Sequence, residues 1–148
     1  MVDVSTKVPT RRTALAQCEV IFTQKQAYDC LKAASLEGRR YKDSRGSWNY
    51  GGKKDVGSHP SVPQIALDFA RVQFKWDDAQ NKVIIECESQ VTDKTGCEME
   101  ALTGASLAAL TVYDMCKGID KSIAINNCRL VRKTGGKSGD YAFDPLNV

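Results

Sequence analysis

The chain has 148 residues, of which 42% are hydrophobic and 26% charged, a composition typical of one soluble domain with its own core. The formal net charge of +3 is small, so overall charge does not indicate a nucleic-acid partner. No uncharged apolar run approaches the length of about eighteen residues that a membrane-spanning helix needs, and the first residues carry no hydrophobic signal region. We therefore expect neither membrane insertion nor secretion, and a cytoplasmic location.

The first half of the chain predicts one strand, one helix and a polar segment. Residues 14–23 contain the β-forming run V-I-F and predict a strand, and residues 24–36 carry apolar residues at helical spacing, with Thr23 available as an N-cap. Residues 37–64 contain glycines and basic residues but few aliphatic ones, which is typical of a solvated loop. A loop of about thirty residues is long for a compact domain. We interpret His59, the only histidine, as a solvated residue of this loop.

The second half predicts a hairpin, a long helix and a last strand. Residues 65–76 and 82–91 read as strands joined by the turn sequence D-D-A-Q-N. Residues 96–117 predict a helix of about twenty residues that is buried over most of its surface, with Gly118 as its C-terminal cap. Residues 123–131 predict a strand, followed by a basic glycine-rich loop at 132–139. This mixture predicts one α+β domain over residues 1–148, with helices packed on one antiparallel sheet.

Two features of the second half could take part in catalysis or ligand binding. Asp114 and Lys117 are three residues apart on the long helix, so they share a face and form either a structural ion pair or an acid–base pair. In K-T-G-G-K-S-G the glycines free the backbone to approach a ligand, and Lys133 and Lys137 can meet a phosphate. A solvated basic loop is the alternative, because this string is not a Walker A motif.

The cysteines show no C-x-x-C pair and no accompanying histidine cluster, so neither zinc nor an iron–sulfur centre is expected. We expect reduced thiols that serve mainly in packing; a disulfide framework is the weaker alternative. They stand at positions 18, 30, 87, 97, 116 and 128.

Three strings in order, E-M-E-A-L-T from residue 98, A-A-L-T-V-Y-D-M-C-K from residue 108 and K-T-G-G-K-S-G from residue 133, resemble the MoaC family. The family consists of cyclic pyranopterin monophosphate synthases of molybdenum-cofactor biosynthesis. The resemblance implies a lyase with a ferredoxin-like fold, which converts a cyclised dihydroguanosine triphosphate into cyclic pyranopterin monophosphate and diphosphate. It also implies dimers assembled into a hexamer, with pockets between subunits. The sequence itself demands no metal or organic cofactor.

The resemblance also implies roles for individual residues. Asp114 and Lys117 match the family's acid–base pair, and Met99 and Glu100 match residues of the substrate pocket. Lys133 and Arg12 match basic residues that contact the substrate phosphates. The alternatives are a core contact for Met99, compensation of the helix dipole for Glu98 and Glu100, and a solvated surface position for Arg12.

Residues 37–63 depart from the family, which has K-G-D-V, then A-G-I-x-A-A-K-x-T, then I-P-L-C-H in this interval. In ungapped register the family's lysine and histidine fall where Glu37 and Pro63 stand. Codons for these residues, read one base downstream, can encode all three family strings in order. We hypothesise a translated frameshift; a natural lineage-specific or alternatively spliced segment is the alternative.

A chain that really carries the printed segment should fold poorly and turn over slowly. The second functional hypothesis is therefore a catalytically impaired binding or assembly module that retains the ferredoxin-like fold. An RNA-binding module ranks third, because neither hairpin strand shows the aromatic pattern that stacks bases. A mitochondrial location replaces the cytoplasmic one if the chain is part of a eukaryotic protein.

Overall fold

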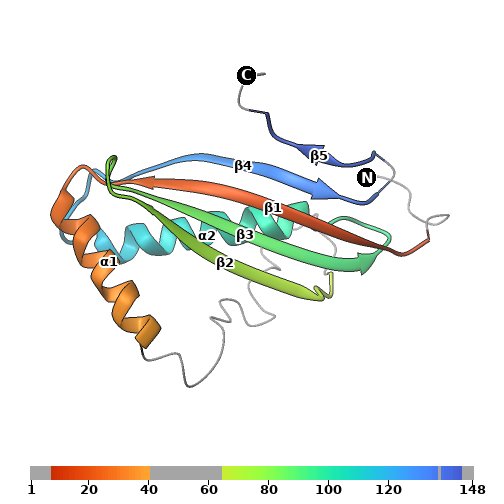
Figure 1. Cartoon of the computed structure of the whole chain (residues 1–148), viewed down its shortest axis with the longest axis horizontal. Helices are drawn as coiled ribbons and strands as arrows, with labels where there is room; N and C mark the ends of the chain where they lie inside the picture. The colour runs from red at the N-terminus through yellow and green to blue at the C-terminus, as the bar shows by residue number, and fades with distance from the viewer. Residues whose placement is uncertain (1–7, 41–64, 137, 145–148) are drawn as a thin grey trace.

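The computed structural model describes residues 8–40, 65–136 and 138–144. Five strands form one sheet in the order β2-β3-β1-β4-β5, with every neighbouring pair antiparallel (Figure 1). This is the expected α+β fold, of the ferredoxin-like kind. The elements are β1 (Thr10–Ile21), α1 (Lys25–Arg40), β2 (Phe69–Asp77), β3 (Lys82–Asp93), α2 (Glu98–Cys116), β4 (Ala124–Thr134) and β5 (Tyr141–Ala142).

The expected hairpin is present as β2 and β3. Asp77 Oδ1 accepts hydrogen bonds from the backbone N–H groups of Ala79 and Gln80, at 3.1 and 3.2 Å. Asn81 has a φ of 47°, a left-handed conformation that asparagine adopts more readily than most residues. The D-D-A-Q-N string therefore turns the chain as its composition predicts.

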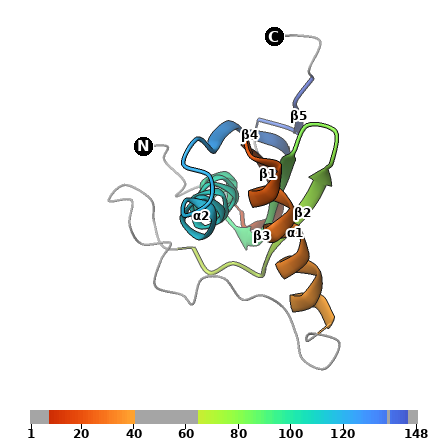
Figure 2. The ribbon, with the colours of Figure 1, turned by 90° about the vertical axis from the view of Figure 1, so that its left-hand side faces the viewer.

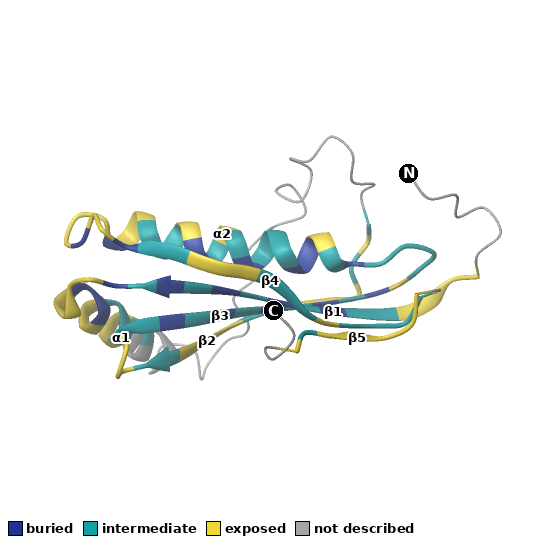
Figure 3. Ribbon diagram, turned by 90° about the horizontal axis from the view of Figure 1, so that it is seen from above, coloured by how far each residue is buried: buried dark blue, intermediate teal, exposed yellow. Residues whose placement is uncertain are grey.

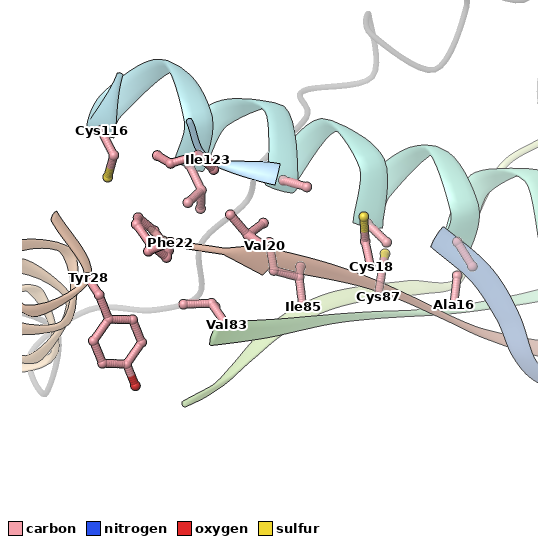
Figure 4. Packing of buried hydrophobic residues seen from close by; sticks show 14 of the residues in the cluster. Ala16, Cys18, Val20, Phe22, Tyr28, Val83, Ile85, Cys87, Cys116 and Ile123 are labelled. Atoms are coloured by element: carbon pink, nitrogen blue, oxygen red, sulfur yellow. The ribbon is translucent and has the colours of Figure 1, made fainter. Parts of the chain in front are cut away.

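Helix α2 lies along one face of the sheet (Figures 2 and 3). Its buried stripe includes Ala101, Ala105 and Ala109, which recur every four residues and so line one side of the helix. The facing strand β1 also presents small residues to the core, among them Ala14 and Ala16. Small side chains on both surfaces allow the helix to pack close to the sheet, and Figure 4 shows the resulting core.

The outer side of α2 is not buried, which corrects the expectation of burial over most of its surface. Leu107, Leu110 and Met115 are 45%, 54% and 65% exposed. The expected Gly118 cap is also wrong: Lys117 occupies the C-cap in a right-handed conformation, and Gly118 is not among the described glycines with positive φ. Within the described ranges, no helix is both long and apolar enough to cross a membrane.

Helix α1 begins beside a set of hydrogen bonds that join two distant segments of the chain. Asp120, in the connection between α2 and β4, accepts hydrogen bonds from the backbone N–H groups of Thr23 and Gln24, each at 2.9 Å. Thr23 donates its own hydroxyl to Asp120 and does not cap the helix, contrary to expectation. Helix α1 continues to Arg40, beyond its expected end at residue 36.

The expectations for the polar segment fall largely outside the described residues. Residues 41–64 include most of the polar segment, with His59, and are not described. The hypothesis of a frameshift in that segment therefore remains a prediction.

Candidate functional site

The expected acid–base pair, Asp114 and Lys117, lies at the C-terminal end of α2. Lys117 Nζ donates to Asp114 Oδ1 at 2.6 Å, and the two side chains are 55% and 71% exposed. The hydrogen bond to Asp114, together with its negative charge, raises the pKa of Lys117. An ion pair this exposed contributes little to folding, so both groups are available to a ligand.

A second polar cluster lies at the N-terminal end of α2. Lys133 Nζ is 3.2 Å from Glu98 Oε1, and the two residues are 35 positions apart in the sequence. Lys133 reaches Glu98 because β4 pairs with β1 in a register that sets Lys133 opposite Ala14. Backbone N–H groups at the start of a helix favour negative charge, so Lys133 and this helix end together form a site suited to an anion.

Arg12 belongs to the same end of the molecule. Its Nε donates to the backbone carbonyl of Asp93 at 3.0 Å. The loop after β4 lies against it: Gly136 has a φ of 97°, and a Cβ atom there would lie 2.9 Å from Arg12 Nη1. The neighbouring Gly135, with a φ of 78°, would place a Cβ atom 2.6 Å from the carbonyl oxygen of Arg11. Glycine is therefore required at both positions. The loop packs against one side of the Arg12 guanidinium.

Glu100 is the most unusual member of this cluster. It is only 6% exposed, and neither carboxylate oxygen has a hydrogen-bond partner among the described residues. Burial raises the pKa of Glu100, to which the nearby charge of Glu98 adds. A buried carboxyl group without a partner is costly, which makes Glu100 a strong candidate to hydrogen-bond a ligand. Met99 beside it is 45% exposed, so it is not the core contact that the alternative interpretation required.

Lys133 also lines a wide groove of about 640 Å³ that runs along β4 and β5. The aromatic side chains of Tyr141 and Phe143 form part of its lining, and the Arg129 guanidinium carbon lies 4.5 Å from the centre of the Phe143 ring. Aromatic faces and cations in one groove suit a ligand that combines a planar ring with negative charge. The groove therefore continues from the cluster of Lys133 and Glu98 at this end of the molecule.

One chain does not bring the two clusters together. Asp114 lies sixteen residues after Glu98 on one helix, so the two clusters are separated by about 24 Å along its axis. The acid–base pair and the cationic groups therefore occupy opposite ends of α2 (Figure 3).

Comparison with known proteins decides the family. The profile of the MoaC family matches residues 1–136. The chain belongs to the MoaC family. It is 44% identical over 146 residues to the cyclic pyranopterin monophosphate synthase of Pelobacter propionicus, covering 95% of this chain and 88% of that protein. Its identity to the synthase of the same name from Bacillus cereus strain Q1 is 41% over 145 residues, covering 96% and 89%.

A plant member of the MoaC family is longer. The protein named cyclic pyranopterin monophosphate synthase, mitochondrial, of Arabidopsis thaliana is 43% identical over 143 residues. The match covers 96% of this chain and 53% of the plant protein, so the chain spans about half the length of that relative.

Sequence reasoning named most of these side chains of the MoaC chain and the local contact of Asp114 with Lys117, but not the contacts between distant segments. The pairing of Lys133 with Glu98 and the packing of Arg12 against Gly136 depend on strand register, which no local pattern encodes. The hydrogen bonds that Asp120 accepts from Thr23 and Gln24 were not predicted. The local sequence indicates only a carboxylate soon after the end of a long helix. Lys137 lies outside the described residues.

Proposed function

We propose that this MoaC-family chain is a cyclic pyranopterin monophosphate synthase of molybdenum-cofactor biosynthesis. It would convert (8S)-3',8-cyclo-7,8-dihydroguanosine 5'-triphosphate into cyclic pyranopterin monophosphate and release diphosphate. The names of the relatives support this lyase activity. The observation that carries the proposal is the hydrogen-bonded pair of Lys117 and Asp114, which is exposed to solvent at a helix end.

The reaction requires proton transfers and stabilisation of a leaving diphosphate, and the two clusters divide these tasks. Lys117 delivers a proton and Asp114 sets its protonation state, as in general acid–base catalysis. Lys133 and Arg12 bind the phosphate chain beside the helix start, where positive charge stabilises the leaving group. Glu100 hydrogen-bonds the polar edge of the purine ring, and Met99 forms an apolar wall.

We further propose that each site is completed by a second copy of the chain. The distance of about 24 Å between the clusters exceeds what one substrate molecule spans, so the start of one α2 must face the end of another. The exposed apolar residues Leu107 and Leu110 between the clusters suit such contact. In this proposal the chain is a single domain that forms dimers and then a hexamer, in the cytoplasm or, as the plant relative's name says of that protein, in mitochondria.

The proposal is tested by incubating the purified chain with the cyclised nucleotide and measuring diphosphate release. We expect turnover by the unmodified chain and a loss of at least about a hundredfold in Lys117→Ala, because the proton donor is removed. Lys121→Ala, an exposed lysine on the connection after α2, is the matched control and should retain activity. Equal activity of the Lys117 and Lys121 variants would contradict the proposal.

The second candidate function is a binding or assembly module without catalysis. It is favoured by one observation: the printed residues 37–63 lack the lysine and histidine that the family resemblance leads us to expect there. Intact mass and peptide mapping of the native protein distinguish the two. Peptides containing G-S-W-N-Y-G-G-K would support the module, whereas peptides containing I-A-G-V-A-G-I-M-A-A-K would support the frameshift and the synthase.

A further inference from the structure

Two cysteines face each other across strands β1 and β4. Cys18 lies in the middle of β1, where the register with β4 is irregular. The flanking partners are Gln17 with Arg129 and Glu19 with Asn126, so Cys18 lies opposite residues 127–128. Facing residues of antiparallel strands have Cα atoms about 4.5–5.5 Å apart, within the range of about 4.4–6.8 Å that a disulfide spans.

Both side chains lie on the side of the sheet that α2 covers. Cys18 is completely buried beneath α2, and its Sγ approaches the backbone carbonyl of Asn126 at 3.7 Å. Cys128 Sγ lies 3.0 Å from the hydroxyl oxygen of Ser106, a residue of α2. Because both thiols lie on the same face, a bond between them requires no reversal of either side chain.

The two thiols differ in access. Cys128 is exposed and lines the groove along β4, so a small oxidant reaches it from solvent. Burial raises the pKa of Cys18 to about 12, and the neighbouring Cys128 thiol adds to the increase. Cys18 therefore keeps its proton at neutral pH, and Cys128 is the thiol that meets an oxidant first.

We propose that Cys18 and Cys128 are an oxidisable dithiol, which a peroxide converts into an intrachain disulfide and a thiol reductant restores. The thiolate of Cys128 attacks one peroxide oxygen, the O–O bond breaks, and a sulfenic acid and a hydroxide form. The hydroxide takes up the proton that the Cys128 thiol released, which gives one water. The sulfur of Cys18 then attacks the sulfenic sulfur, and the S–O bond breaks. The proton of Cys18 leaves with the hydroxide as a second water.

Cys87 is the competing partner, since Figure 4 shows its sulfur near that of Cys18 in the core. In the register, however, Cys87 pairs with Ala16, and Cys18 pairs with Ile85. The two cysteines are thus diagonal neighbours, with Cα atoms about 7–8 Å apart, beyond the usual disulfide range. Cys87 is also buried, so no exposed thiol starts the reaction there.

The test treats the full chain with hydrogen peroxide, blocks the remaining thiols and maps tryptic peptides by mass. Cleavage after Lys and Arg places Cys18, Cys128, Cys30 and Cys87 on four separate peptides. We expect the peptides of Cys18 and Cys128 to appear joined, about 2 Da below their summed mass, and to separate after reduction.

Two variants control this experiment. Cys128→Ser should abolish the joined peptide, whereas Cys30→Ser should retain it, since Cys30 is the other exposed cysteine of the described chain. Three results would overturn the proposal: Cys18 joined to Cys87, Cys128 joined to a second copy on a non-reducing gel, or Cys128 oxidised to sulfinic acid while Cys18 remains free.

Discussion

At the scale of single residues, the charge of Asp114 affects the pKa of Lys117 and, in the proposed mechanism, the reaction rate. Asp114→Asn keeps the shape of the side chain but removes the charge that raises the pKa of Lys117. We expect kcat to fall by roughly 10²–10⁴ with little change in melting temperature, because the pair is exposed. The pKa of Lys117 should fall, so the alkaline limb of the pH–rate profile should move to lower pH. A profile whose alkaline limb stays at the same pH in this variant would show that Lys117 is not the titrating acid.

Asp120 is a structural carboxylate, and its contribution to the stability of the fold depends on pH. The hydrogen bond from the Gln24 N–H, with further bonds from Thr23 and Ser122, lowers the pKa of Asp120 below its usual range. A lowered folded-state pKa stabilises the fold above the unfolded value of about 3.9, and this stabilisation is lost as pH falls through the folded value.

Asp120→Asn should therefore lower the melting temperature at pH 7 by about 5 °C or more. The difference from the unmodified chain should shrink as pH falls below about 4, as first the unfolded and then the folded chain binds a proton at this carboxylate. Thermal unfolding followed by circular dichroism at several pH values measures both effects. Asp29→Asn, in an exposed pair on α1, is the control, and a difference that stays constant with pH would refute the argument.

The local contact of Asp114 with Lys117 could be predicted, because helix geometry alone brings residues three apart together. The contact of Glu98 with Lys133 could not, because it requires β4 to pair with β1 in one register out of several. The exposure of Met99 and the isolation of Glu100 likewise depend on tertiary packing, which helix periodicity does not specify.

At the scale of elements, hydrophobic pattern and turn composition located both helices and the first four strands of the part of the chain that the structure describes. Their ends differ because pairing extends them: β1 starts at Thr10, where it still pairs with Asp93, and β4 continues to Thr134, opposite Thr13. Strand β5 was not predicted, since two residues have no periodicity and pair only because β4 offers an edge. The outer face of α2 was wrongly predicted to be buried, because its apolar residues do not reveal what covers them.

The packing of α2 on β3 depends on Gly104. A Cβ atom at this position would lie 2.5 Å from Cys87 Sγ, closer than packed atoms approach. Gly104→Ala should therefore destabilise the fold by about 1–2 kcal/mol through overpacking, although alanine favours a helix by about 1 kcal/mol over glycine.

A double-mutant cycle isolates this effect in chemical denaturation. Adding Cys87→Ala should remove the clash, so the double variant should be more stable than the sum of the single effects predicts. Gly118→Ala is the control, because nothing lies within 4 Å of its added Cβ atom, and it should leave stability unchanged or slightly raised. Additivity of Gly104→Ala and Cys87→Ala would rule out the proposed contact.

At the scale of the whole molecule, the length of α2 determines where a complete site can form. The nineteen residues of α2 place Asp114 about 24 Å from Glu98, the contact of Lys133, along the helix axis. In a twofold dimer with each site shared, every site takes its acid–base pair from one chain and its phosphate-binding residues from the other. Two chains that are each inactive for a different reason should therefore restore one another.

Lys117→Ala and Lys133→Ala chains, mixed in equal amounts under conditions of subunit exchange, test this arrangement. Each mixed dimer has one site with both mutations and one site with neither. Random pairing makes half of the dimers mixed, so roughly a quarter of all sites, and of the normal diphosphate release, should return. Mixing Lys117→Ala with Asp114→Asn is the matched control and should restore nothing, because every site of a mixed dimer keeps one defective member of the same pair. Recovery in neither mixture, with exchange shown by mass spectrometry, would place both clusters of a site in one chain and refute the shared site.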